Sequence, residues 1–211
     1  MKGEILERLK VDRLHVSPRV LELSPITTQR RFRHIWEPLD ELLSRLRPLP
    51  VGLLRVWLDQ RGGHIIITHL ASHYEPGEQA FRRQRLRNVA FVRLSDLAEG
   101  SLEALVPLGH LLDHLLGSGG TAGGLWLSEG GGISPGLREV GGGVRELFPL
   151  GYGFDKAACR EAQSYFARSV ALYLHDRRAL NVADPQIERL LRTTVFSGAF
   201  WRSRQTHAGK G

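Results

Sequence analysis

The sequence predicts an α+β fold: a small mixed or antiparallel sheet packed on two central helices, with a glycine-rich loop between the helices. Three observations predict this class. Two short apolar runs, 64–70 and 88–94, are rich in β-branched residues. Two longer segments, 95–116 and 155–176, repeat apolar residues at helical spacing. Residues 117–143, between these segments, hold 12 of the glycines.

Size and charge narrow the class of protein. The chain has 211 residues and 42% hydrophobic content, which suffices for one substantial core. The net charge of +7 comes mostly from arginine. The single cysteine, Cys159, excludes an internal disulfide and a multi-cysteine metal site. No run of 18 apolar residues occurs and the charged N-terminus lacks a signal-peptide pattern, so we expect a cytoplasmic protein with no membrane partner.

The N-terminal half is expected to contain one helix and three strands. Residues 1–34 are charged and weakly periodic, which predicts an extension that packs loosely. Leucines at helical spacing predict a helix within 36–50. Residues 51–59 and 64–70 are apolar runs around a glycine turn, and they predict a β-hairpin. The polar residues 75–88 indicate a loop or short helix, and 88–94 the third strand.

The C-terminal half is expected to be helical. Residues 95–116 are predicted to be mostly helix, with Pro107 inside it, and 117–143 to form no regular element. The segment 155–176 shows the strongest helical pattern, with Asp155 as a possible cap. Asp184 and Pro185 are typical of the start of a further helix at 184–196. The main domain should span 35–200, before a frayed basic tail at 201–211.

The stretch "LVPLGHLLDHLLGSGG", residues 105–120, contains the most specific pattern. His110 and His114 are four residues apart, and Asp113 lies between them. In zincin enzymes, a His-Glu-x-x-His helix presents two imidazoles to a zinc ion, and the glutamate polarises the metal-bound water. Here only part of that pattern is present.

Several motifs resemble the anthrax-lethal-factor-like metallopeptidases. "GHLLDHLLG" at 109–117 resembles the end of their zinc helix, and "SYFARSVALYL" at 164–174 is similar to the helix that supplies their third ligand. "GYGFD" at 151–155 and "DPQIERLL" at 184–191 are also similar. The resemblance covers roughly 53–196 and implies a zincin-like domain.

The resemblance also implies that the zinc site is lost. The first ligand histidine falls on Val106, the catalytic glutamate on Pro107, and the retained second ligand on His110. The third ligand falls on Ser164, or on Gln163 if the register shifts by one. We therefore expect a catalytically inactive metallopeptidase-like domain without a cofactor, which binds a protein partner. Small and apolar replacements further predict that the vacated cleft is sealed.

A rebuilt metal site is the first alternative. His110, Asp113 and His114 could hold zinc for an unorthodox metal-dependent hydrolase, whereas the competing interpretation makes Asp113 and His114 structural groups. Tyr152 falls near the position of an oxyanion-stabilising tyrosine in the resembled family.

A basic nucleic-acid-binding accessory protein is the second alternative. Four arginines cluster in "FRRQRLRN", and guanidinium groups bind phosphate. The candidate contacts are Arg82, Arg83, Arg85 and Arg87. A solvated surface explains the same cluster without a ligand.

Overall fold

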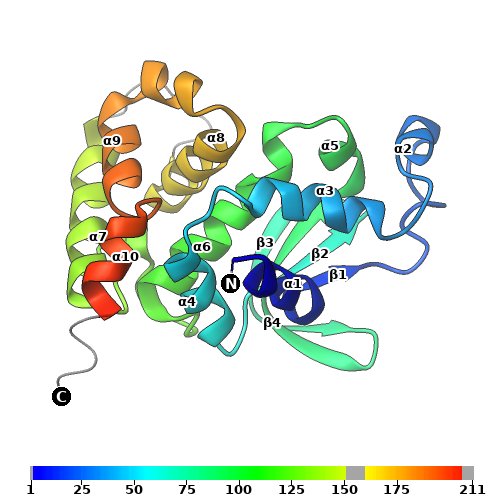
Figure 1. The fold of residues 1–211 in the computed structure, drawn as a ribbon, viewed down its shortest axis with the longest axis horizontal. Coiled ribbons are helices and arrows are strands. Elements are labelled where there is room, and N and C mark those ends of the chain that lie inside the picture. Colours follow the sequence, from blue (N-terminus) through cyan, green and yellow to red (C-terminus); the bar gives the residue numbers. More distant parts are fainter. Residues whose placement is uncertain (1, 151–159, 206–211) are drawn as a thin grey trace.

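The computed structural model describes residues 2–150 and 160–205, and it has a mixed α+β fold (Figure 1). Four strands form one sheet in the order β1-β2-β4-β3. The first three strands in this order run parallel, and β3 pairs antiparallel with β4 at the edge of the sheet. The strands are β1 (Leu14–Val16), β2 (His64–Thr68), β3 (His73–Phe81) and β4 (Gln84–Arg93). The predicted α+β class with a small mixed sheet is confirmed.

Ten α-helices lie within the described ranges, five before α6 in the chain and four after it, and α4 of the first group also contacts α10 of the second (Figure 1). The group near the sheet is α1 (Lys2–Arg13), α2 (Ile26–Arg31), α3 (Glu37–Leu46), α4 (Val51–Asp59) and α5 (Leu94–Ala98). The central helix α6 (Val106–Ser118) packs on β3 and β4 and also on α8. The group beyond α6 is α7 (Pro135–Leu147), α8 (Ala162–Ala183), α9 (Pro185–Thr193) and α10 (Gly198–Gln205).

The N-terminal residues belong to the core, which corrects the expectation of a loose extension over 1–34. Strand β1 adds to the sheet beside β2, in parallel register. Helix α1 buries Ile5, Leu6 and Leu9. Weak periodicity concealed this packing because only one narrow stripe of α1 is apolar.

The predicted hairpin over 51–59 and 64–70 is wrong in its first half. Residues 51–59 form α4, because Leu53, Leu54 and Trp57 face one side at helical spacing and pack into the core. The Trp57 Nε1–H group donates to the Gly63 carbonyl across the following turn, at 2.7 Å. A short apolar run is compatible with either a strand or a helix. Here the helix is the conformation that buries the apolar side of 51–59.

Residues 75–88, expected to be a loop or short helix, form a β-hairpin between β3 and β4. The side chains of β3 are polar because this strand lies at the sheet edge and is largely exposed. The turn residue Arg82 has a φ of 54°, in the left-handed region. The ladder is irregular between Glu75 and Glu78, where Asn88 accepts a hydrogen bond from the Gly77 amide.

The glycine-rich residues 117–143 are only partly irregular, which is a second correction. A 3-10 turn, η2 (Leu127–Glu129), and most of α7 lie within them. Ser134 caps α7 by accepting from the Leu137 amide, and Pro135 occupies the first turn. Gly141 is required because a Cβ there would meet the Leu127 and Gly131 carbonyl oxygens. These glycines permit close packing, so their number did not indicate a loop.

The helical predictions for the C-terminal half hold with changed limits: α8 begins at Ala162, and the predicted cap Asp155 lies outside the described residues. The segment 95–116 divides into the end of α5, the 3-10 turn η1 (Leu102–Ala104) and α6. Pro107 lies in the first turn of α6, where its missing N–H costs no helical hydrogen bond. Asp184 caps α9 as predicted, by accepting from two amides. Residues 201–205 belong to α10, and Trp201 is buried, so this part of the tail is not frayed.

Two histidines and an arginine meet where β1 joins β2. The His15 Nε2 and His64 Nδ1 atoms lie 3.0 Å apart. The Arg13 guanidinium lies 3.4 Å from His64 Nε2 and donates to the Leu58 and Gln60 carbonyls. Burial, followed by the charges of Arg13 and His15, lowers the pKa of His64 from 6.5 to about 4.

This cluster predicts a loss of stability in mild acid. Because the folded pKa of His64 is depressed, the unfolded chain takes up a proton as the pH falls from 6.5 toward about 4, and the folded chain does not. Between pH 7.5 and 5, the wild type should lose about 1 kcal/mol more unfolding free energy than His64→Gln, after allowance for solvent screening. Urea unfolding at the two pH values measures this, with His175→Gln as the exposed control. Parallel pH profiles for wild type and His64→Gln would refute the assignment.

Candidate functional site

A cleft of about 360 Å³ lies between the start of β3 and the first half of α6. Four distant parts of the chain contribute to its walls, and several of the side chains are rings. We call it the ring cleft. Its lining residues are Ser72, His73, Tyr74, Pro76, Glu103, Val106, Pro107, His110, Trp126 and Gln163.

A second hollow, of about 230 Å³, adjoins the ring cleft. Its lining residues are Val106, His110, Ser164 and Arg168. Val106 and His110 are one helical turn apart on α6 and line both hollows, and Ser164 approaches from α8. The positions assigned from the resemblance to one metal site therefore do lie together. The cleft is open, however, so the expectation that apolar packing seals it is wrong.

His110 is the one titratable side chain retained at these positions. Its ring makes no hydrogen bond within the described parts of the chain, and burial lowers its pKa from 6.5 to about 4. The ring lies 6.4 Å from the Tyr74 ring and 6.1 Å from the Trp126 ring, between centroids. His110 is consequently neutral at pH 7 and forms part of an aromatic wall.

The residues present do not fit a zinc ion. A zincin site needs three protein ligands and a carboxylate base. Val106 and Pro107 have no ligand atom, and Ser164 offers only a hydroxyl group. Among the described residues, no three histidine, cysteine, aspartate or glutamate side chains lie close enough to hold a metal ion together.

Asp113 is a structural group that faces away from the ring cleft. It is fully buried, and its two carboxylate oxygens accept from the Ser128 amide at 2.8 Å and the Ser128 hydroxyl at 2.7 Å. Burial raises its pKa from 3.8 to about 8. These bonds tie η2 to the middle of α6, and they position the adjacent Trp126.

His114 uses both ring nitrogens within the fold. Its Nε2 lies 3.1 Å from the Thr121 carbonyl oxygen, which requires that Nε2–H donates. Nδ1 is then the acceptor for the Tyr74 hydroxyl at 2.7 Å. The ring also stacks on Trp126, with 4.7 Å between centroids. The alternative ligand set of His110, Asp113 and His114 therefore does not converge on one point.

The structural role of Asp113 predicts which of two substitutions lowers the free energy of unfolding more. Asp113→Asn should be tolerated, because the amide oxygen can accept from the Ser128 amide and the NH₂ group can donate to the hydroxyl. Asp113→Ala should cost about 2–3 kcal/mol more than Asp113→Asn, because it leaves the buried Ser128 amide without a partner. Chemical denaturation at pH 7 measures both values. Equal losses for the two variants would contradict this structural role.

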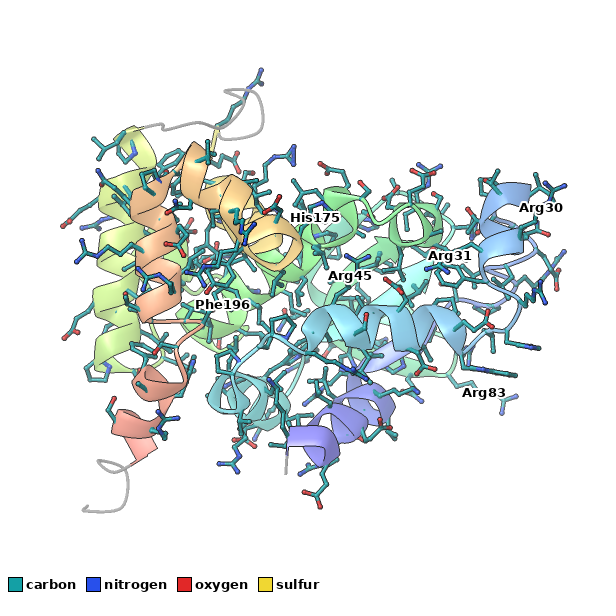
Figure 2. All side chains as sticks on the ribbon, turned by 45° about the horizontal axis from the view of Figure 1, so that its top comes forward. Arg30, Arg31, Arg45, Arg83, His175 and Phe196 are labelled. Atoms are coloured by element: carbon teal, nitrogen blue, oxygen red, sulfur yellow. The ribbon has the colours of Figure 1, made fainter. Side chains whose placement is uncertain are left out.

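The predicted arginine cluster lies on the β3–β4 hairpin. Three of its four guanidinium groups contact other groups of the protein. Arg85 and Arg87 form ion pairs with Glu78 at 3.3 and 2.5 Å. Arg82 donates to the Val16 carbonyl and lies over the Phe81 ring. Arg83 projects from the end of the molecule (Figure 2). Glu78 carries one negative charge, so it offsets one of the four positive charges, and its ion pairs engage two of the four guanidinium groups, which weakens the case for a phosphate-binding surface.

Sequence reasoning missed six of the ten residues that line the ring cleft, among them Tyr74, Trp126 and Glu103. Trp126 is the one aromatic residue in the glycine-rich segment 117–143, and this was the sequence feature that could have marked it as a site residue. Tyr152 lies outside the described residues. No protein-family model, curated protein or solved structure matches the chain. In the described part of the chain, no helix is long and apolar enough to cross a membrane.

Proposed function

We propose that the chain is a catalytically inactive, metallopeptidase-like domain that binds an extended segment of a protein partner in the ring cleft. The observation that carries this proposal is the cleft itself. The positions that resemble a metal site surround an accessible hollow, yet they hold Val106, Pro107, His110 and Ser164. Such a lining offers contact area to a ligand and lacks the groups of a hydrolytic site.

The position of β3 supports an extended ligand. Among the described residues, strand β3 has a neighbouring strand on one side only, so the other edge of its backbone is available for hydrogen bonds with an added segment. Its first residues, His73 and Tyr74, line the ring cleft together with Ser72, which precedes the strand. Pro76 and the irregular ladder at Glu75–Glu78 end this stretch. A bound segment would therefore contact only a few residues of β3 and place its side chains in the cleft.

The chemistry of the lining supports binding over hydrolysis. No described residue forms a hydrogen bond with His110 that would orient it as a base, and a pKa of about 4 makes it a weak base at neutral pH. The nearest carboxylate in the lining, Glu103, forms an ion pair with Arg168 at 2.9 Å. Neither residue is arranged with a nucleophile.

Selection from a displayed library of random heptapeptides tests the proposed function. Peptides selected on the purified chain should bind Trp126→Ala at least about tenfold more weakly, since interface aromatics of this kind contribute 2 kcal/mol or more. Val106→Arg should also block binding, because the larger side chain fills the cleft while Trp126 itself is unchanged. Trp36→Ala, at an exposed site away from the cleft, is the control. Selected peptides that bind all four proteins equally would contradict the proposal.

A further inference from the structure

We infer that the ring cleft is a receptor for a cationic side chain, lysine or arginine, of the bound segment. This inference rests on the proposed function and names the class of residue that the cleft selects. It depends on three features of the described residues: the arrangement of the rings, the charge of the lining, and the ion pair between Glu103 and Arg168.

Four of the lining side chains carry aromatic rings, and three of them, Tyr74, His110 and Trp126, lie close to one another. The Tyr74 and Trp126 centroids lie 5.6 Å apart with their planes at 89°. His110 is nearly parallel to Tyr74 and almost perpendicular to Trp126. The Tyr74 hydroxyl is bound to His114, so that its ring, and not its polar tip, is left for a ligand. A cation within about 6 Å of such ring faces is attracted by their quadrupoles.

The polar groups of the lining favour a donor. Glu103 supplies a carboxylate. The Gln163 NH₂ group donates to Glu129, which leaves the Gln163 carbonyl oxygen as an acceptor. None of the described residues that line the ring cleft is lysine or arginine, although the chain has a net charge of +7. The uncharged state of His110 at neutral pH removes a further source of repulsion.

Arg168 already occupies one oxygen of Glu103. Its Nη1 atom lies 2.9 Å from Glu103 Oε1, at the border between the ring cleft and the second hollow. An incoming cation therefore shares this carboxylate with a cation of the protein. Removal of the Arg168 charge should strengthen cation binding, whereas removal of the Glu103 charge should weaken it. A site that selected an apolar side chain would respond to neither change.

Peptide titrations followed by nuclear magnetic resonance test the inference. The probes are acetylated heptapeptides of glycine and alanine whose central residue is arginine, lysine, glutamine or norleucine. The Trp126 indole N–H signal is one of four, and Trp126→Phe assigns it. Arginine and lysine peptides should bind at least about fivefold more tightly than the norleucine peptide, as expected for a cation over aromatic rings.

Two charge variants of the cleft should change the preference for a cationic peptide in opposite directions. Glu103→Gln should reduce the preference for a cation about fivefold, and Arg168→Gln should increase it by a similar factor. Arg83→Gln, on the distant hairpin, should leave the preference unchanged. Non-specific attraction cannot imitate this result, because a chain of net charge +7 repels cationic peptides.

The outcomes separate the inference from the proposed function. Equal affinities for arginine and norleucine peptides would overturn cation selection and leave peptide binding in the cleft intact. A cation preference that is undiminished in Glu103→Gln would also overturn it. If no heptapeptide shifts the Trp126 signal, the inference is refuted, and the library selection decides separately whether the cleft binds any peptide.

Discussion

Replacing Gly109 by alanine should lower the free energy of unfolding by at least about 2 kcal/mol. Helices α6 and α8 cross at this residue with almost no space between their backbones. A Cβ atom built on Gly109 would lie 2.5 Å from the Ala167 Cα atom and even closer to the Ala167 carbonyl oxygen. Backbone atoms inside a helix cannot move aside like the end of a long side chain, so one helix must shift.

Gly142→Ala is the matched control. Gly142 lies within α7, and a Cβ atom there would have nothing within 4 Å. This change should stabilise the fold by about 0.5–1 kcal/mol, because alanine has the higher helix propensity. Urea unfolding of the two variants measures the contrast. If Gly109→Ala is also stabilising, then α6 and α8 do not approach each other as described.

The Gly109 contact also sets the geometry of the candidate site. His110 follows it on α6, and Ser164 lies one turn before Ala167 on α8. A shift of either helix would therefore widen the second hollow. Gly109→Ala should weaken peptide binding along with stability, whereas Gly142→Ala should leave peptide binding unchanged.

Installing zinc ligands at the positions assigned from the resemblance should make the stability of the chain depend on zinc. The triple variant Val106→His, Pro107→Glu and Ser164→Glu adds a histidine one turn before His110 and carboxylates on α6 and α8. Without metal, it should lose about 1–4 kcal/mol, from lost packing and from polar groups without partners. At a free zinc concentration of a hundred times Kd, it should regain about 2.7 kcal/mol by mass action. Thermal unfolding with and without zinc measures both effects.

Two controls accompany the triple variant. The wild type should show no zinc-dependent stabilisation, because His110 alone cannot replace a three-ligand set. Addition of His110→Ala to the triple variant should abolish the zinc response. A triple variant that neither loses stability nor regains it with zinc would show that the assigned register is wrong. That result would also remove the resemblance as a basis for the proposed function.

Local patterns predicted the elements whose signals were unambiguous. The Asp184–Pro185 pair marks the start of α9, since a capping carboxylate followed by proline is suited to a helix start and to little else. The run 64–68 is a strand, as its β-branched residues indicate, and it is buried throughout. The run 51–59 was ambiguous, because a nine-residue run that is mostly apolar can pack as a strand or as a helix.

The candidate site was predictable only where it depended on helix periodicity. The i, i+4 relation of Val106 and His110 follows from the sequence once α6 is recognised, and Ser164 was placed opposite them by resemblance. Whether this hollow is filled or open depends on neighbouring segments. Trp126 and Tyr74 lie beside His110 and line the cleft with it. The three residues come from distant parts of the sequence, so no spacing pattern predicts that they lie together.

By itself, the sequence determined the α+β class and the helix that carries His110. Those features depend on residue identity and on periodicity within one segment. Only the tertiary structure decided that Asp113 and His114 are structural, that α1 and β1 belong to the core, and that the cleft is open. The physical reason is that hydrogen-bond partners and packing neighbours come from residues distant in the chain, such as Ser128 for Asp113 and Tyr74 for His114.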